Sequence, residues 1–204
     1  MSDERPENLS AAEALELLKA GNQRFVSDSV TRPHSDSARR QELVGGQRPF
    51  ATIITCADSR VPVELVFDRG LGDLFVIRVA GNIADDAVLG STEYASLYLG
   101  VNLIVVMGHR SCGAVSAAVE YLNVDGSATN THIDTLIDAI RPAVRAVESR
   151  GGDDLRERSI QQNAIMVADQ IRRSEPVFAG LGKQSVEVLP AYYDLESGEV
   201  HWLS

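Results

Sequence analysis

Short runs of largely apolar residues place the strongest constraint on how this chain can fold. They occupy residues 50–55, 74–79, 103–107 and 186–189. A strand with one solvated face alternates apolar and polar side chains, whereas a strand buried on both faces is apolar throughout. Helical patterns separate the first three runs, near residues 61–67 and 85–99. Strands that alternate with helices predict an α/β fold with a central, mostly parallel β-sheet flanked by helices.

Further helices and a hairpin are predicted in the rest of the sequence. Ser10 and Glu13 have capping-box spacing, which predicts a helix over 10–26 within an N-terminal helical arm, residues 1–45. Further helices are predicted near 36–44, 114–122, 132–149 and 153–174, with Pro176 as the stop signal after the last. Residues 192–195 and 200–203 predict a C-terminal edge hairpin. No repeat or linker divides the sequence, so we expect a single domain over 1–204.

The charge balance narrows the possible partners. The chain has 19 basic and 29 acidic residues, which gives a net charge of 19 − 29 = −10. Such a chain repels nucleic acid and anionic membrane surfaces, so neither is an expected partner. No apolar run approaches the ~20 residues that span a bilayer, and the polar N-terminal residues do not resemble a signal peptide. We therefore expect a cytoplasmic protein.

Residues able to carry chemistry follow two of the predicted strands. Cys56, Asp58 and Arg60 come directly after the first strand, and His109 and Cys112 come at the end of the third. The carboxyl ends of parallel strands share one edge of a sheet, where ligands bind in open α/β folds. Two thiolates and an imidazole suit Zn²⁺ and leave one coordination position open.

Other interpretations of the two cysteines remain open on these grounds. A single cysteine after a strand is usually a small core residue, and a redox pair would also use two thiols. Neither alternative accounts for the histidine, aspartate and arginine beside them. Joint placement of all five residues at equivalent strand ends favours a metal site.

The sequence resembles the β-class carbonic anhydrases over almost its whole length. The pattern Cys-x-Asp-x-Arg at 56–60 and His-x-x-Cys at 109–112 carries the resemblance, together with the motifs at 75–82, 93–95, 108–115 and 192–194. One departure is Val79, where many members of the family have asparagine.

This resemblance implies a zinc enzyme that reversibly hydrates carbon dioxide to bicarbonate and a proton. It implies Cys56, His109 and Cys112 as zinc ligands and a catalytic pair, Asp58 and Arg60. Asp58 would become the fourth ligand in a closed state. Two alternatives stay open: a hydrolase of carbonyl sulfide or carbon disulfide on the same scaffold, and a non-catalytic, zinc-binding sensory protein.

The resemblance also implies a homodimer or homotetramer whose substrate pocket is shared between subunits. Gln47, Phe75 and Tyr94 match pocket residues that a neighbouring subunit supplies in similar plant-like enzymes; as isolated residues they would be a solvated glutamine and two core aromatics. Ile53 occupies the position where bicarbonate-inhibited members have tryptophan, so we expect the plant-like, open-site type. The N-terminal arm is expected to pack on the neighbouring subunit.

Overall fold

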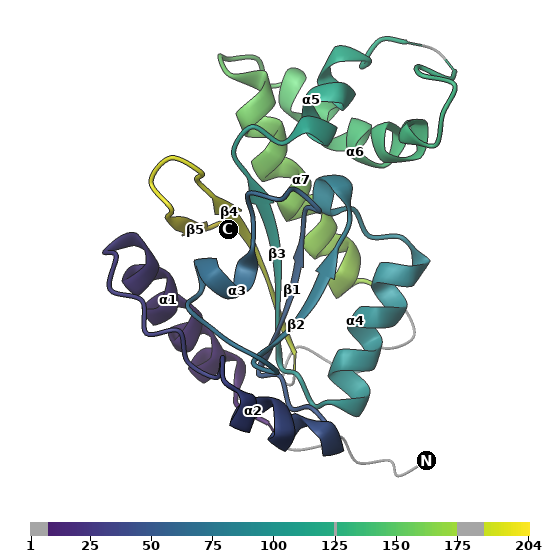
Figure 1. Cartoon of the computed structure of the whole chain (residues 1–204). Coiled ribbons are helices and arrows are strands. Elements are labelled where there is room, and N and C mark those ends of the chain that lie inside the picture. The colour runs from purple at the N-terminus through teal and green to yellow at the C-terminus, as the bar shows by residue number, and fades with distance from the viewer. Residues whose placement is uncertain (1–7, 125, 175–185) are drawn as a thin grey trace.

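A five-stranded sheet forms the centre of the protein (Figure 1). The computed structural model describes residues 8–124, 126–174 and 186–204. Within them the strand order is β2-β1-β3-β4-β5. The first four strands pair in parallel, and β5 pairs antiparallel with β4. The strands are β1 (Ala51–Thr55), β2 (Leu74–Arg78), β3 (Leu103–His109), β4 (Glu187–Tyr193) and β5 (Val200–Trp202). The predicted α/β class with a mostly parallel sheet is confirmed.

Both faces of the central strands are covered, which explains their uninterrupted apolar sequences. Ile53 and Val105 pack on one face with residues of α1 and α3. Ile54 and Val106 pack on the opposite face with residues of α4 and α7. All four side chains are fully buried. Burial of successive residues therefore removes the alternation that a half-exposed strand would show.

The helices lie close to their predicted positions. They are α1 (Ala11–Val26), α2 (Ser37–Glu42), α3 (Val63–Val66), α4 (Asp86–Tyr98), α5 (Gly113–Glu120), α6 (Ile133–Glu148) and α7 (Leu155–Arg172), with short 3-10 turns at η1 (Leu43–Gly45) and η2 (Ala80–Asn82). The predicted capping box is present at α1, where Ser10 and Glu13 exchange side-chain-to-backbone hydrogen bonds. Figure 1 shows α5 and α6 together beyond the upper ends of the strands. None of the helices in the described ranges is long and apolar enough to cross a membrane.

The C-terminal strands differ from prediction in one respect. The runs predicted as a central strand at 186–189 and a hairpin arm at 192–195 form one continuous strand, β4, which passes through Pro190. The Pro190 carbonyl accepts a hydrogen bond from Leu203 N–H, so its backbone polar side faces β5 rather than β3. The proline nitrogen, which carries no hydrogen, faces the same side. Its missing N–H therefore removes no hydrogen bond between β4 and β3.

Helix α1 packs on its own chain. Ala14 and Leu18 are fully buried in the core cluster beneath it. Gly21 allows close approach to α3, because a Cβ there would lie 1.8 Å from the Phe67 carbonyl oxygen. Packing of the predicted arm on a neighbouring subunit stays a prediction. Residues 1–7 of that arm and the predicted stop at Pro176 lie outside the described residues.

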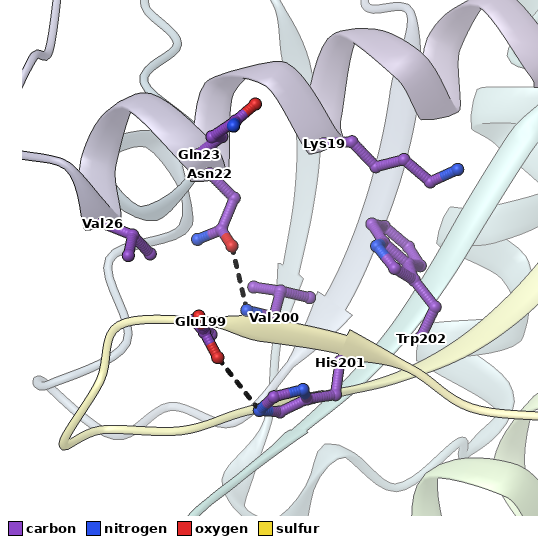
Figure 2. Close-up of a pocket in the computed structure, with 8 residues that line it drawn as sticks. All are labelled: Lys19, Asn22, Gln23, Val26, Glu199, Val200, His201 and Trp202. Carbon is purple, nitrogen blue, oxygen red and sulfur yellow. Dashed lines mark hydrogen bonds and ion pairs between the residues drawn. The ribbon is translucent and has the colours of Figure 1, made fainter.

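Asn22 connects α1 to two other segments of the chain. Its Nδ2 donates to the carbonyls of Val66 and Gly198, at 3.1 and 2.9 Å. Its Oδ1 accepts from Val200 N–H at 2.9 Å, the bond drawn in Figure 2. The outer edge of β5 is thus capped by a helix side chain.

Candidate metal centre

Two sulfurs and one imidazole nitrogen meet at the carboxyl edge of the sheet. Cys56 follows β1, His109 ends β3, and Cys112 precedes α5 as its N-cap. One ligand atom from each lies within 4.8 Å of the others. Cys56 is 5% exposed and the other two are fully buried. These three residues, the Cys–His–Cys cluster, are the set that sequence reasoning placed at this edge.

The imidazole of His109 is oriented by its own backbone neighbourhood. Nδ1 lies 2.9 Å from the Arg110 carbonyl oxygen, which can only accept, so Nδ1 carries the proton. Nε2 then presents its lone pair toward the sulfurs, and among the described residues this buried atom has no hydrogen-bond partner. A ring held at one nitrogen with the other free is the usual arrangement of a metal-binding histidine.

The cluster fits a zinc ion. The two sulfurs are 4.0 Å apart, and tetrahedral zinc with Zn–S bonds of ~2.3 Å separates two sulfur ligands by about 3.8 Å. The buried, unpartnered Nε2 supplies a third donor of the type zinc prefers. Both cysteines are free thiols.

Local hydrogen bonds favour a thiolate at Cys56. The Cys112 thiol donates to Cys56 Sγ, and this bond outweighs burial and lowers the pKa of Cys56 to about 4. The backbone N–H of Gly81 also donates to that sulfur, at 3.3 Å. The same thiol–thiolate bond, together with burial, raises the pKa of Cys112. The hydrogen bond therefore favours the thiolate form at Cys56 and the thiol form at Cys112.

Asp58 and Arg60 form a bidentate ion pair beside the cluster. Arg60 Nε and Nη2 donate to the two carboxylate oxygens at 2.9 and 2.7 Å, and Arg60 N–H adds a third bond at 2.9 Å. The Arg60 hydrogen bond holds the pKa of Asp58 well below its usual range, so Asp58 is ionised at neutral pH. Asp58 Oδ2 lies 3.8 Å from His109 Nε2. A carboxylate that accepts hydrogen bonds thus lies beside the three ligand atoms of the Cys–His–Cys cluster.

Two further residues support the turn after β1, and sequence reasoning gave them no role. Arg78 donates to the backbone carbonyls of Cys56 and Asp58, at 3.2 and 2.5 Å. Gly81 has a φ of +74°, which aims its N–H at the Cys56 sulfur. Arg78 ends β2 and Gly81 follows three residues later, so the available signals were their position at the end of that strand and their place in the 75–82 motif.

The three predicted pocket residues lie away from the chain's own cluster. Phe75 pairs with Thr52, three residues before the end of β1, which places it about 10 Å from that edge. Tyr94 lies beside Phe75, with ring centroids 6.3 Å apart, and is 46% exposed. Gln47 is exposed before β1, at the opposite edge of the sheet. The structure therefore does not join these residues to the cluster within one chain.

A separate, open pocket lies between α1 and β5 (Figure 2). It is lined by Lys19, Asn22, Gln23, Val26, Glu199, Val200, His201 and Trp202. None of the predicted site residues lines it. The chemistry argued from the sequence belongs to the Cys–His–Cys cluster and not to this pocket.

Several known proteins similar to this chain share one description. The carbonic anhydrase family profile matches residues 51–200, a range that contains the whole cluster. Carbonic anhydrase 2 of Mycobacterium tuberculosis is 40% identical over 196 residues, covering 94% of this chain and 92% of that protein.

Solved structures agree with the sequence relatives. A Coccomyxa β-carbonic anhydrase in complex with acetazolamide has a TM-score of 0.74 at 26% identity, covering 92% of this chain and 85% of that one. A tetrameric β-carbonic anhydrase from Sordaria macrospora has a TM-score of 0.71 at 25% identity, covering 94% and 98%.

Proposed function

The chain belongs to the β-class carbonic anhydrases, and from this premise we propose that it reversibly hydrates carbon dioxide at a zinc ion held by Cys56, His109 and Cys112. One observation carries the proposal. The buried Nε2 of His109 has no hydrogen-bond partner in the described chain and lies within 4.8 Å of two thiol sulfurs, one of low pKa. An uncompensated buried donor set of this kind is costly unless a cation completes it.

The ion and the residues around it would have different roles in the reaction. Zinc, when bound, supplies the Lewis acidity that makes a hydroxide nucleophile available near neutral pH. Three protein ligands leave one coordination position for the reactants. Cys56, His109 and Cys112 would hold the ion at the carboxyl edge of the sheet, where Asp58 Oδ2 lies 3.8 Å from His109 Nε2.

Asp58 orients the attacking oxygen. Its carboxylate is ionised and can only accept, so it takes a hydrogen bond from the nucleophile's O–H and directs a lone pair toward the carbon of CO₂. Arg60 occupies both carboxylate oxygens and keeps Asp58 in this place. This pairing supports the open-site type, in which Asp58 is turned to Arg60 rather than to the metal.

A second copy of the chain would complete the substrate pocket. Gln47 and Tyr94 are exposed and distant from their own cluster, and Phe75 lies on β2, an edge strand of the sheet. These positions suit residues that serve a neighbouring site, as the family resemblance implies. We therefore propose a homodimer or homotetramer.

The two free cysteines also favour a cytoplasmic location, because cysteines stay reduced in that compartment.

The metal assignment is tested by elemental analysis and stopped-flow CO₂ hydration on the same samples. Wild type should carry about one zinc per chain, and His109→Ala should lose both zinc and activity. His132→Ala is the matched control, because His132 is an exposed residue before α6. Full zinc retention in His109→Ala would contradict the ligand set. Turnover of carbonyl sulfide without CO₂ hydration would instead indicate the alternative hydrolase.

The ion pair is tested with the metal in place. Asp58→Asn and Arg60→Ala should keep zinc and lose ~10- to 100-fold in kcat/KM, as supporting groups around metals typically do. Arg40→Ala, an exposed arginine on α2, is the control. Wild-type kinetics in Arg60→Ala would reduce the pair to a structural ion pair.

Shared pockets predict rescue between two inactive variants. A Cys112→Ser subunit would lack metal but could still supply Tyr94 to the site of its neighbour. A Tyr94→Ala subunit would hold metal, but in an oligomer made of that variant alone no neighbour would supply the tyrosine. Co-expression with two affinity tags isolates the hybrid, which should contain one complete site and regain activity. Hybrid activity no higher than that of either parent would show that Tyr94 does not serve a neighbour.

A further inference from the structure

A carboxylate outside the Cys–His–Cys cluster holds the backbone that presents Cys112. Glu157 lies in the first turn of α7. Its Oε1 accepts from Ser111 N–H at 2.9 Å, and its Oε2 accepts from the Tyr192 hydroxyl at 2.9 Å. One side chain therefore ties α7 to the turn after β3 and to strand β4.

The turn that Glu157 holds is conformationally strained. Ser111 has a φ of +56°, in the left-handed region that residues with side chains rarely adopt. It separates His109, the last residue of β3, from Cys112, the N-cap of α5. The reversal at Ser111 lets both side chains face one point. Such a conformation persists only where its surroundings hold it, and the Glu157 acceptor satisfies its N–H.

Helix α7, which carries Glu157, is itself held in place by close packing on β3 and by a hydrogen bond to Gly81. Gly108 of β3 lies so close to α7 that an added Cβ would be 2.9 Å from Ile160 Cγ2. Asn163 on the same helix donates to the Gly81 carbonyl at 2.9 Å, and Gly81 N–H donates to Cys56 Sγ. The helix thus braces both sulfur-bearing turns, one through Asn163 and the other through Glu157.

We propose that Glu157 is a positioning residue that fixes the Ser111 turn and thereby aims the Cys112 sulfur at the metal. The inference rests on the proposed zinc site. Both carboxylate oxygens are engaged, so Glu157 acts through the backbone and not as a ligand. Burial and the neighbouring carboxylate raise the pKa of Tyr192, so its hydroxyl remains a donor that anchors Glu157.

The test measures zinc release to a chromogenic chelator and the spectrum of the Co²⁺-substituted protein. Glu157→Ala should lower zinc affinity by ~10- to 100-fold and alter the sulfur-to-cobalt charge-transfer band. Glu157→Gln should stay close to wild type, because its amide oxygen can accept from Ser111 and its amide nitrogen can donate to the tyrosine oxygen. Asp169→Ala is the control: Asp169 is an acidic residue on the same helix, and within the described residues its side chain pairs with Arg172 of that helix.

The outcomes separate this inference from the proposed function. Wild-type zinc release and an unchanged cobalt spectrum in folded Glu157→Ala would overturn the positioning role. If Glu157→Ala does not fold, Tyr192→Phe decides, because it removes one anchor of the carboxylate; unchanged zinc release there would also overturn it. Failure of wild type to bind zinc, or of Cys112→Ser to weaken binding, would refute the zinc site itself.

Discussion

Replacing Asn22 by alanine should destabilise the protein by removing three hydrogen bonds at once. The buried Val200 N–H and Val66 carbonyl would lose the side-chain partner that Asn22 provides, while the Gly198 carbonyl is part-buried and can reach water. A buried polar group left unpaired costs ~1–3 kcal/mol. Two such groups give about 2–6 kcal/mol, and water entering the vacated space brings the expected loss to about 3 kcal/mol.

Urea unfolding at fixed protein concentration measures this loss. With a urea slope near the upper end of the usual range, ~3 kcal/mol/M, the midpoint should fall by about 1 M. The shift should not depend on protein concentration, since all three partners belong to the same chain. Asn22→Asp should be worse than Asn22→Ala, because it keeps the acceptor for Val200 but turns a carboxylate toward two carbonyls.

Gln23→Ala provides the control for helix propensity and surface change. Gln23 is the exposed neighbour of Asn22 on α1 and lines the same open pocket (Figure 2). Its replacement should leave the midpoint nearly unchanged. Equal midpoints for Asn22→Ala and Gln23→Ala would refute the reasoning, and would mean that α1 is not held to β5 by these bonds.

Three further perturbations have expected outcomes. Leu18→Ala empties a fully buried position under α1 and should cost ~2–5 kcal/mol by the same urea assay, with near-neutral behaviour arguing against the described core. Gly81 has a φ of +74°, and an added Cβ would lie 2.5 Å from Ile140 Cδ1, so Gly81→Ala should lower both the melting temperature and the zinc content; unchanged zinc content would show that the strain does not reach the Cys56 sulfur. Burial raises the pKa of Asp68, but hydrogen bonds from Arg24, Thr31 and Arg32 outweigh it and hold that pKa below its usual range. Its stabilisation should therefore be complete above about pH 4 and decline as pH falls toward the folded-state pKa; Asp68→Asn should flatten this acid limb of the stability curve, and an unaltered limb would exclude Asp68 as its source.

Local patterns in the sequence were sufficient for the elements and for the ligand candidates. Ser10 and Glu13 predict the start of α1 because a capping box is a contact between residues three apart in sequence. The apolar runs predict β1 and β3 because strands covered on both faces cannot alternate. Cys56 and His109 follow at the ends of those strands, and parallel pairing brings such ends to one edge.

Only the tertiary structure decided how distant segments meet. The runs at 186–189 and 192–195 were predicted as separate strands, yet β4 continues through Pro190 because the backbone polar side of that residue faces β5 and not β3. Phe75 and Tyr94 could have lined their own chain's site, but the register of β2 against β1 places Phe75 about 10 Å from the cluster edge. Pairing register and exposure are properties of the assembled sheet.

The support of the Cys112 turn shows the same limit most clearly. Glu157 lies 46 residues from Ser111 in sequence, and nothing in its own surroundings distinguishes it from other acidic residues in first helical turns. Its role exists because Gly108 lets α7 pack closely on β3, which brings the carboxylate to the Ser111 N–H. A sequence specifies helices and strand ends through neighbours a few residues apart, whereas contacts between them depend on how whole elements dock, and that is settled by packing across the core.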